Sequence, residues 1–210
     1  MGTSPGKLGH RTEEADGDGR SARRERNIDA VLDAVIDLFT AGDLFPTVEQ
    51  VSKRSGLSVR SVYRYFPDPA SLRDAAIRRH RARSESLAHL SAIGQGPLDH
   101  RIEEFVAMRL RLHNGIGAAY RATVYNAPRH SSLQEQLARN RSELRDQFEQ
   151  QFQAELSTLP PSERRAVVTA GDILTQLDSI DVLRFHRGLS VAKTTEALRV
   201  GLQRLLGGTR

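Results

Sequence analysis

The spacing of apolar side chains along the chain predicts helices in almost every segment. From Ile28 to Phe39, apolar residues recur every three or four positions, as they do on the buried face of a helix. The same spacing recurs in later segments, and none shows the sustained apolar–polar alternation that is typical of a half-buried strand. The pattern therefore predicts an all-α protein.

Capping signals predict where these helices begin and end. Thr47 and Gln50 have the spacing of a capping box, Gly56 favours a tight exit from a short helix, and Ser58 caps the next helix. Pro69 suits the first turn of a fourth helix. After a first helix that starts near residue 27, helices are expected over residues 47–55, 58–66, 69–90, 98–113, 131–156, 161–186 and 190–206, with a short one that follows Gly115 and Gly117 and ends near Asn126.

The segment over residues 47–72, TVEQVSKRSGLSVRSVYRYFPDPASL, joins two short helices by a glycine turn. This is the layout of a helix-turn-helix, whose second helix reads the major groove of DNA. Between Gln50 and Phe66 there are four basic residues and no acidic one. A helical hairpin with a solvated basic face is the alternative. We favour DNA binding because the capped turn, the lack of acids and the aromatic pair Tyr63 and Tyr65 occur together.

The second helix of this segment supplies candidate DNA contacts. Arg60 and Ser61 lie in its first turn, where side chains reach base edges, and an arginine binds guanine O6 and N7 together. Thr47, at a helix start, can donate to a phosphate through its hydroxyl and its backbone. Arg64 suits either a base or a phosphate.

Residues inside and before this segment also form a pattern shared with known regulators. The stretch RNIDAVLDAVIDLFTAG ends in Leu38, Phe39 and Gly42, and the second short helix carries Tyr63, Tyr65 and Phe66, followed by Leu72. These residues resemble the first helix and the Tyr-x-Tyr/His-Phe pattern of the TetR family of bacterial transcriptional regulators. The similarity is densest from about residue 23 to 77 and looser afterwards, chiefly in FQAELSTLP and LDSIDVLRFHRGLSVAKTTEALRVGLQRLL.

The resemblance implies a role for each part of the chain. It implies that the Tyr63 and Tyr65 hydroxyls contact phosphates, and that a small three-helix DNA-binding domain precedes a larger helical bundle for dimerisation and ligand binding. We expect a disordered tail over residues 1–21, the DNA-binding domain over 22–68 and the larger domain over 69–210. The predicted DNA contacts are Thr47, Ser58, Val59, Arg60, Ser61, Tyr63, Arg64 and Tyr65.

The larger domain is expected to hold two further sites. An effector pocket is predicted among its helices, lined by some of Phe105, Met108, Leu112, Tyr120, Tyr125, Phe148 and Leu177. A homodimer interface is predicted on the last two helices, at Leu174, Leu183, Val191, Leu198 and Leu202. For each of these side chains, ordinary core packing is the alternative interpretation.

The tail and the first helix leave one question open. Residues 1–21 contain almost no large apolar side chain, so they do not bury enough surface to order themselves. Arg20 lies at the end of this tail, and Arg23, Arg24 and Arg26 follow it. Two interpretations remain for these arginines: a flexible arm along a DNA groove, or a solvated tail.

Composition limits the classes of protein and of functional site that the chain can form. The net charge of +5 and the pI near 10 suit nucleic acid binding but are shared by many helical proteins. The lack of cysteine and of any long apolar run predicts a soluble, cytoplasmic protein that does not enter a membrane. The seven histidines lack paired ligand spacing, and Asp172, Asp178 and Asp181 lack a companion nucleophile. We expect no metal, no cofactor and no enzymatic activity.

Together these observations predict a homodimeric transcriptional regulator that reads a pseudo-palindromic operator in double-stranded DNA. A repressor released by a small-molecule effector is the favoured form. The alternatives are a DNA-binding regulator without an effector, and a helical module whose basic face binds an acidic protein.

Overall fold

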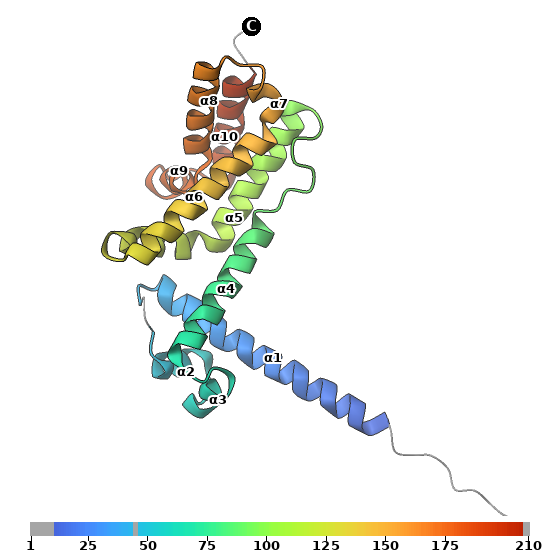
Figure 1. The fold of residues 1–210 in the computed structure, drawn as a ribbon, viewed down its shortest axis with the longest axis vertical. Helices are drawn as coiled ribbons and strands as arrows, with labels where there is room; N and C mark the ends of the chain where they lie inside the picture. The colour runs from blue at the N-terminus through green and yellow to red at the C-terminus, as the bar shows by residue number, and fades with distance from the viewer. Residues whose placement is uncertain (1–10, 44–45, 208–210) are drawn as a thin grey trace, which may run out of the picture. The chain divides into compact units, whose positions relative to one another are not determined.

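A computed structural model describes residues 11–43 and 46–207, with side chains from residue 19 onward (Figure 1). Within these residues every regular element is a helix, and the all-α prediction is confirmed. The α-helices are α1 (Arg11–Thr40), α2 (Val48–Ser55), α3 (Val59–Tyr65), α4 (Pro69–Leu87), α5 (Leu98–Asn126), α6 (Ser131–Gln151), α7 (Gln153–Leu156), α8 (Pro161–Thr175), α9 (Leu177–Asp181) and α10 (Val191–Leu206). A 3₁₀ turn, η1 (Ala127–Arg129), and a π-helical turn, η2 (Val182–His186), complete the set.

The chain divides into two compact units, and the division falls inside α4. Unit 1 ends at His80 and unit 2 starts at Arg81. The start of α4 falls in unit 1 because Leu72 and Ala76 are buried in the core of that unit. The first half of α4 therefore belongs to the same packed body as α1, α2 and α3.

Unit 1 is built around β-branched side chains from its three N-terminal helices. Val31 of α1, Val51 of α2 and Val62 of α3 have no exposed surface and pack in one cluster. Each residue of this kind contributes about 1.5–3 kcal/mol when it is removed from water. This burial holds three short or amphipathic helices in one arrangement, although α2 and α3 are too short to be stable alone.

The first helix starts earlier than the sequence predicted. It was expected from near residue 27 but begins at Arg11, so the second half of the predicted tail is helical. A helix that is already nucleated adds one backbone hydrogen bond per residue, and Arg, Glu and Ala, which are frequent before Asn27, favour this extension. Residues 1–10 lie outside the described part of the chain.

Unit 2 packs its helices around α5 and a group of three phenylalanine rings. The ring of Phe105 lies 5.9 Å from that of Phe148 and 5.3 Å from that of Phe152, in edge-to-face arrangements that aromatic pairs prefer. All three side chains are fully buried. They join α5 to α6 at the centre of this unit.

Helix α5 is continuous through the two glycines that were predicted to interrupt it. A Cβ atom on Gly115 would lie 2.2 Å from Leu87 Cδ1, so the bare backbone lets α5 approach the end of α4. A glycine inside a helix costs about 1 kcal/mol relative to alanine, which packing on both sides outweighs. The predicted junction near Gly117 was therefore wrong.

Two predicted long helices are interrupted. The helix expected over residues 161–186 stops at Thr175, since Gln176 adopts an extended conformation with ψ of 152°. The Gln176 side chain donates to the Arg141 carbonyl, at 3.2 Å, and to the Asp172 carboxylate, which holds the break in place. The helix expected over residues 131–156 is similarly divided at Phe152. Within the described residues, no helix has the length and apolar character that crossing a bilayer requires.

Candidate nucleic-acid interface

Three capping interactions fix α2 and α3, and all three agree with the predictions. The Thr47 hydroxyl accepts from the Gln50 backbone N–H at 3.3 Å, while the Gln50 side chain accepts from the Thr47 N–H at 2.6 Å. Gly56 ends α2 in the left-handed region, with φ of +74°. The Ser58 hydroxyl accepts from the Ser61 N–H at 3.2 Å and so starts α3. The end of α2 and the start of α3 are therefore set locally.

Further contacts hold the turn between the two helices. The Ser52 hydroxyl donates to the Leu57 carbonyl at 2.5 Å, across the turn itself. Gln50 donates to the Asp43 carboxylate at 2.6 Å and ties the start of α2 to the preceding loop. These bonds hold the residues that lead into α2 and α3.

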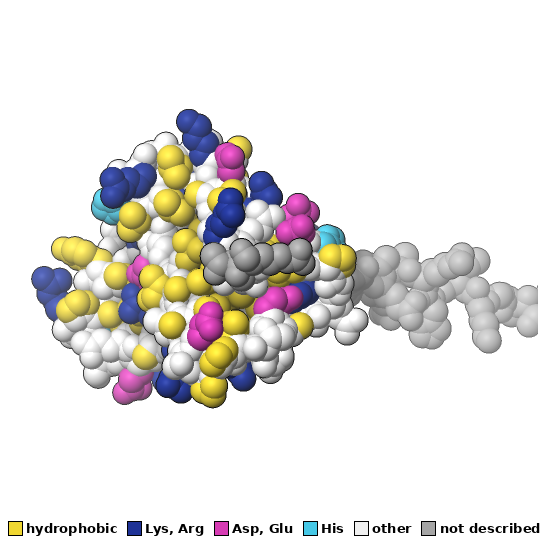
Figure 2. All heavy atoms as spheres, turned by 90° about the horizontal axis from the view of Figure 1, so that it is seen from above, with side chains coloured by type: hydrophobic (Ala, Val, Ile, Leu, Met, Phe, Trp, Pro, Cys, Tyr) yellow, Lys and Arg dark blue, Asp and Glu magenta, His cyan; other side chains and the backbone are white. Residues whose placement is uncertain are grey.

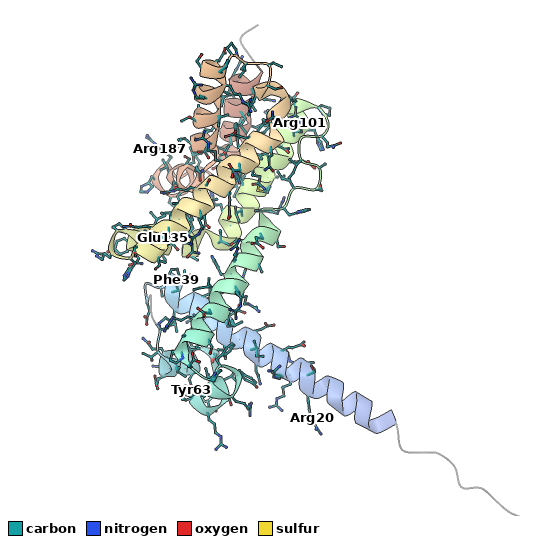
Figure 3. The ribbon with its side chains drawn as sticks, in the orientation of Figure 1. Arg20, Phe39, Tyr63, Arg101, Glu135 and Arg187 are labelled. Atoms are coloured by element: carbon teal, nitrogen blue, oxygen red, sulfur yellow. The ribbon has the colours of Figure 1, made fainter. Side chains whose placement is uncertain are left out.

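The outward face of α3 carries the exposed cation that was predicted to read bases. Arg60 is exposed in the first turn, and its guanidinium forms no hydrogen bond or ion pair with any residue that the structure describes. Tyr63, one turn further on, is 43% exposed and is labelled in Figure 3. By contrast, Arg54 of α2 is paired with Asp37 at 2.9 Å. Of the two arginines Arg54 and Arg60, only Arg54 is therefore held by a carboxylate.

Tyr65 differs from the prediction. It was expected to face outward with a hydroxyl available to phosphate, but it is half-buried and its hydroxyl accepts from Asn27 Nδ2 at 3.0 Å. Arg64 donates to the same oxygen at 2.9 Å and lies over the ring. The hydrogen bonds from Asn27 and then Arg64 lower the pKa of Tyr65 below its usual value. Tyr65 therefore joins α3 to α1.

Two further predicted contacts have structural roles. Val59, which was predicted to contact DNA, is half-buried and packs against the unit 1 core. Ser61 is half-buried, and its hydroxyl lies 2.9 Å from that of Ser58. The exposed members of the predicted set are Thr47, Ser58, Arg60, Tyr63 and Arg64.

The residues predicted to line an effector pocket are mostly inside the unit 2 core. Tyr120 is buried, and its hydroxyl donates to Asp178 at 2.7 Å. Tyr125 is 73% exposed and lies beside Arg129, so its predicted place inside a pocket was wrong. The others, which are all fully or almost fully buried, are Phe105, Met108, Leu112, Phe148 and Leu177.

A pocket of about 310 Å³ lies elsewhere in unit 2. It is formed by the connection between α4 and α5 together with the outer face of α5, and it includes none of the predicted effector residues. Its lining residues are His89, Leu90, Ser91, Glu104, Ala107 and Arg111.

The predicted dimer residues divide between the core and the surface. Leu198 and Leu202 have no exposed surface within a single chain, so their predicted place on an interface was wrong. Leu174 and Leu183 are half-buried, while Val191 is exposed. Sequence reasoning missed the large exposed apolar side chains of the same region, which are Ile173, Val182, Phe185 and Val200.

The acidic residues that suggested acid–base chemistry are paired with other groups. Arg141 donates to both oxygens of Asp178, and Asp181 lies 2.7 Å from His113 Nε2 and 2.9 Å from an Arg121 nitrogen. Burial first, and then the bond to Asp178, raises the pKa of Tyr120 above its usual range. These carboxylates therefore hold α9 against α5 and α6.

One buried cation in unit 2 was not predicted. Arg109 is almost fully buried, with its guanidinium over the Phe105 ring and hydrogen bonds to Gln147, at 2.7 Å, and the Leu144 carbonyl, at 2.6 Å. Burial lowers the pKa of Arg109 to about 9, which still leaves it protonated at neutral pH. Its place on the apolar face of α5 was a signal in the sequence, since an arginine there must find buried acceptors.

Comparisons with known proteins add no family assignment. No protein-family model matches the chain, and no curated protein matches it. Among the side chains that the structure describes, no three histidines or carboxylates come together as ligands for a metal ion.

Proposed function

We propose that this protein is a sequence-specific DNA-binding transcriptional regulator of the TetR type, with α3 as its recognition helix. The observation that carries the proposal is Arg60. It is an exposed arginine without a protein partner among the described residues, in the first turn of a helix that begins at the Ser58 cap and is held by the buried Val62.

The chemistry of the α3 face suits the major groove. An arginine in the first turn of a recognition helix reaches the base edges and binds guanine O6 and N7 in a bidentate manner. Tyr63 and Arg64 follow at the distance of one turn, where hydroxyl and guanidinium groups bind phosphates and fix the register of the helix. We assign base readout to Arg60 and positioning to Tyr63, Arg64 and Thr47.

The proposed regulator acts as a homodimer through α8 and α10. A Cβ atom on Gly201 would lie 2.8 Å from Leu174 Cδ2, so these two helices approach closely. Beside this contact Ile173 is 61% exposed and Val200 is 43% exposed. Figure 2 shows apolar side chains between charged ones on the face of unit 2 seen there. A second copy that covers these side chains would present two recognition helices to half-sites roughly 34–36 Å apart.

Repression that is relieved by a small molecule is the mode that the resemblance to the TetR family implies. An effector releases DNA only by its difference in affinity between the free and the DNA-bound protein. A compound that lowers operator affinity tenfold must itself bind tenfold more weakly to the operator complex, which is about 1.4 kcal/mol of coupling. A thermal-shift screen with and without operator measures this reciprocity.

Selection of DNA from a random pool by the purified full-length chain tests the central proposal. We expect an enriched sequence with two-fold symmetry that retains its preference as salt rises, because base contacts do not depend on counterion release. Binding that disappears for all sequences between about 50 and 200 mM salt, with no enriched motif, would contradict sequence-specific regulation. That result favours the alternative in which the basic face binds an acidic protein.

A further inference from the structure

The core-facing side of α1 continues beyond the core as a basic stripe. Val31 and Val35 are buried on this side, and Asn27 lies one turn before Val31. Arg23 and Arg24 lie four and three residues before Asn27, which places them on the same side of the helix. The face that packs in unit 1 therefore becomes cationic where α1 leaves the core.

A hydrogen bond fixes which way this stripe faces. Asn27 Nδ2 donates to the Tyr65 hydroxyl at 3.0 Å, so this side of α1 is directed to the end of the recognition helix. The charge of Arg24 also lowers the pKa of Tyr65, after the hydrogen bonds from Asn27 and Arg64 and the charge of Arg64. Arg24 of α1 and Arg64 of α3 thus both act on Tyr65, from two different helices.

The charges on the helix are distributed unevenly around it. Arg23 and Arg24 are both exposed. Each residue turns the helix by about 100°. Glu25, two residues before Asn27, therefore projects from the opposite side of the helix. Between Arg23 and Asn27, the side of α1 that faces α3 therefore carries arginines and no carboxylate.

We propose that Arg23 and Arg24 bind backbone phosphates of DNA next to the bases that α3 reads, as part of a helical arm. This inference rests on the proposed DNA-binding function. It selects between the two interpretations that the sequence left open, and it replaces a flexible arm with an ordered one. The arm adds affinity and fixes orientation but reads no bases, because phosphates are the same at every position.

The helical form of the arm has a consequence for binding. A flexible segment loses roughly 1–2 kcal/mol of backbone entropy for each residue that it orders on DNA, whereas residues already in α1 do not. Each phosphate contact made by an arginine also releases counterions and contributes about 0.9 to the slope of log affinity against log salt. Two contacts therefore account for a slope of roughly 1.8.

Salt-dependent binding of the full-length chain to its selected duplex tests the proposal. The variant that combines Arg23→Gln with Arg24→Gln should bind more weakly, lower the salt slope by roughly 1.8 and keep the base preference of the wild type. The matched control combines Arg139→Gln with Arg145→Gln, which removes the same charge from exposed positions on α6. An unchanged slope in the first variant, or an equal change in the control, would overturn the proposal.

A second variant separates a helical arm from a loose basic segment. Exchanging Arg23 and Glu25, as Arg23→Glu with Glu25→Arg, keeps the composition and net charge but moves one cation to the other side of the helix. We expect this exchange to lower the salt slope and the affinity, since the moved charge no longer faces the α3 side. A wild-type slope after the exchange would overturn the helical arm.

The measurements also separate this proposal from the one on which it rests. If the wild-type chain selects no DNA sequence and binds no duplex, both proposals fail together. If the wild type binds a selected duplex while both arm variants retain its affinity and slope, only the arm is excluded.

Discussion

The Phe148 ring of α6 occupies the place where a side chain on Gly171 of α8 would begin. A Cβ atom on Gly171 would lie 2.1 Å from Phe148 Cζ, and two further ring carbons lie within 3 Å of it. Phe148 is fully buried and touches the rings of Phe105 and Phe152, so it has no free space into which to move. The crossing of α6 and α8 therefore depends on the absence of a single methyl group.

Gly171→Ala should destabilise unit 2 by about 1–3 kcal/mol, because an inserted methyl must displace a ring that is held on several sides. Gly115→Ala is the matched control. Its Cβ would meet only one close atom, the tip of the half-buried Leu87 side chain, which can rotate away. Urea unfolding of both variants measures the difference. Equal stability of the two alanine variants would show that the Phe148 contact is not rigid.

Glu155→Ala should destabilise unit 2 by about 3 kcal/mol, because it leaves a buried cation without its counterion. Arg101 is almost fully buried, with both of its terminal nitrogens on the Glu155 carboxylate. The comparison is Glu135→Ala, which removes an exposed pair with Arg139 at 3.7 Å and should change stability by less than about 0.5 kcal/mol. Chemical denaturation at neutral pH distinguishes these outcomes.

The stabilising contribution of Tyr120 should be lost in alkali. Burial and the bond to Asp178 raise its pKa in the folded state, so above pH 10 the unfolded chain loses this proton while the folded chain keeps it. Its stabilising contribution is complete below pH 10.0 and decreases above it by up to about 1.4 kcal/mol per pH unit. Tyr120→Phe should unfold less steeply with pH there. Parallel curves of stability against pH for the two proteins would contradict this assignment.

Arg60→Ala should weaken binding to the best selected site by about 1–3 kcal/mol and relax one base position. Tyr63→Phe, by contrast, should weaken all sequences alike, because it loses a phosphate contact. Fluorescence anisotropy with the selected duplex and with single-base variants measures both effects. If Arg60→Ala keeps the wild-type affinity and base preference, Arg60 does not read bases.

Ile173→Glu should give a folded chain that is monomeric and binds operator weakly, because the charge lies on the exposed apolar face of α8. Light scattering gives the mass, and circular dichroism shows whether the helices are retained. Ala138→Glu, at an exposed position on α6, is the control and should remain dimeric. A wild-type chain that is monomeric at micromolar concentration would exclude the proposed dimer.

Local sequence signals predicted the local structure of unit 1 well. The capping box at Thr47, the left-handed Gly56 and the cap at Ser58 depend on residues at most four positions apart, and all three are present. Longer helices were predicted less accurately where a distant side chain decides the outcome. At Gly115 the sequence predicted an interruption, but packing against Leu87 accompanies a continuous α5. At Gln176 it predicted a continuous helix, but α8 ends there and the Gln176 side chain contacts α6.

By itself, the sequence determined that the chain is helical and that the segment around α2 and α3 presents a basic surface, because helical periodicity and capping act within a few residues. Only the tertiary structure decided which of those side chains are available. Tyr65 is held by Asn27, which is 38 residues away in the chain, and Leu198 is buried by helices that no local pattern joins to it. Such contacts depend on how the helices pack against one another, and the spacing of residues along one helix does not specify that packing.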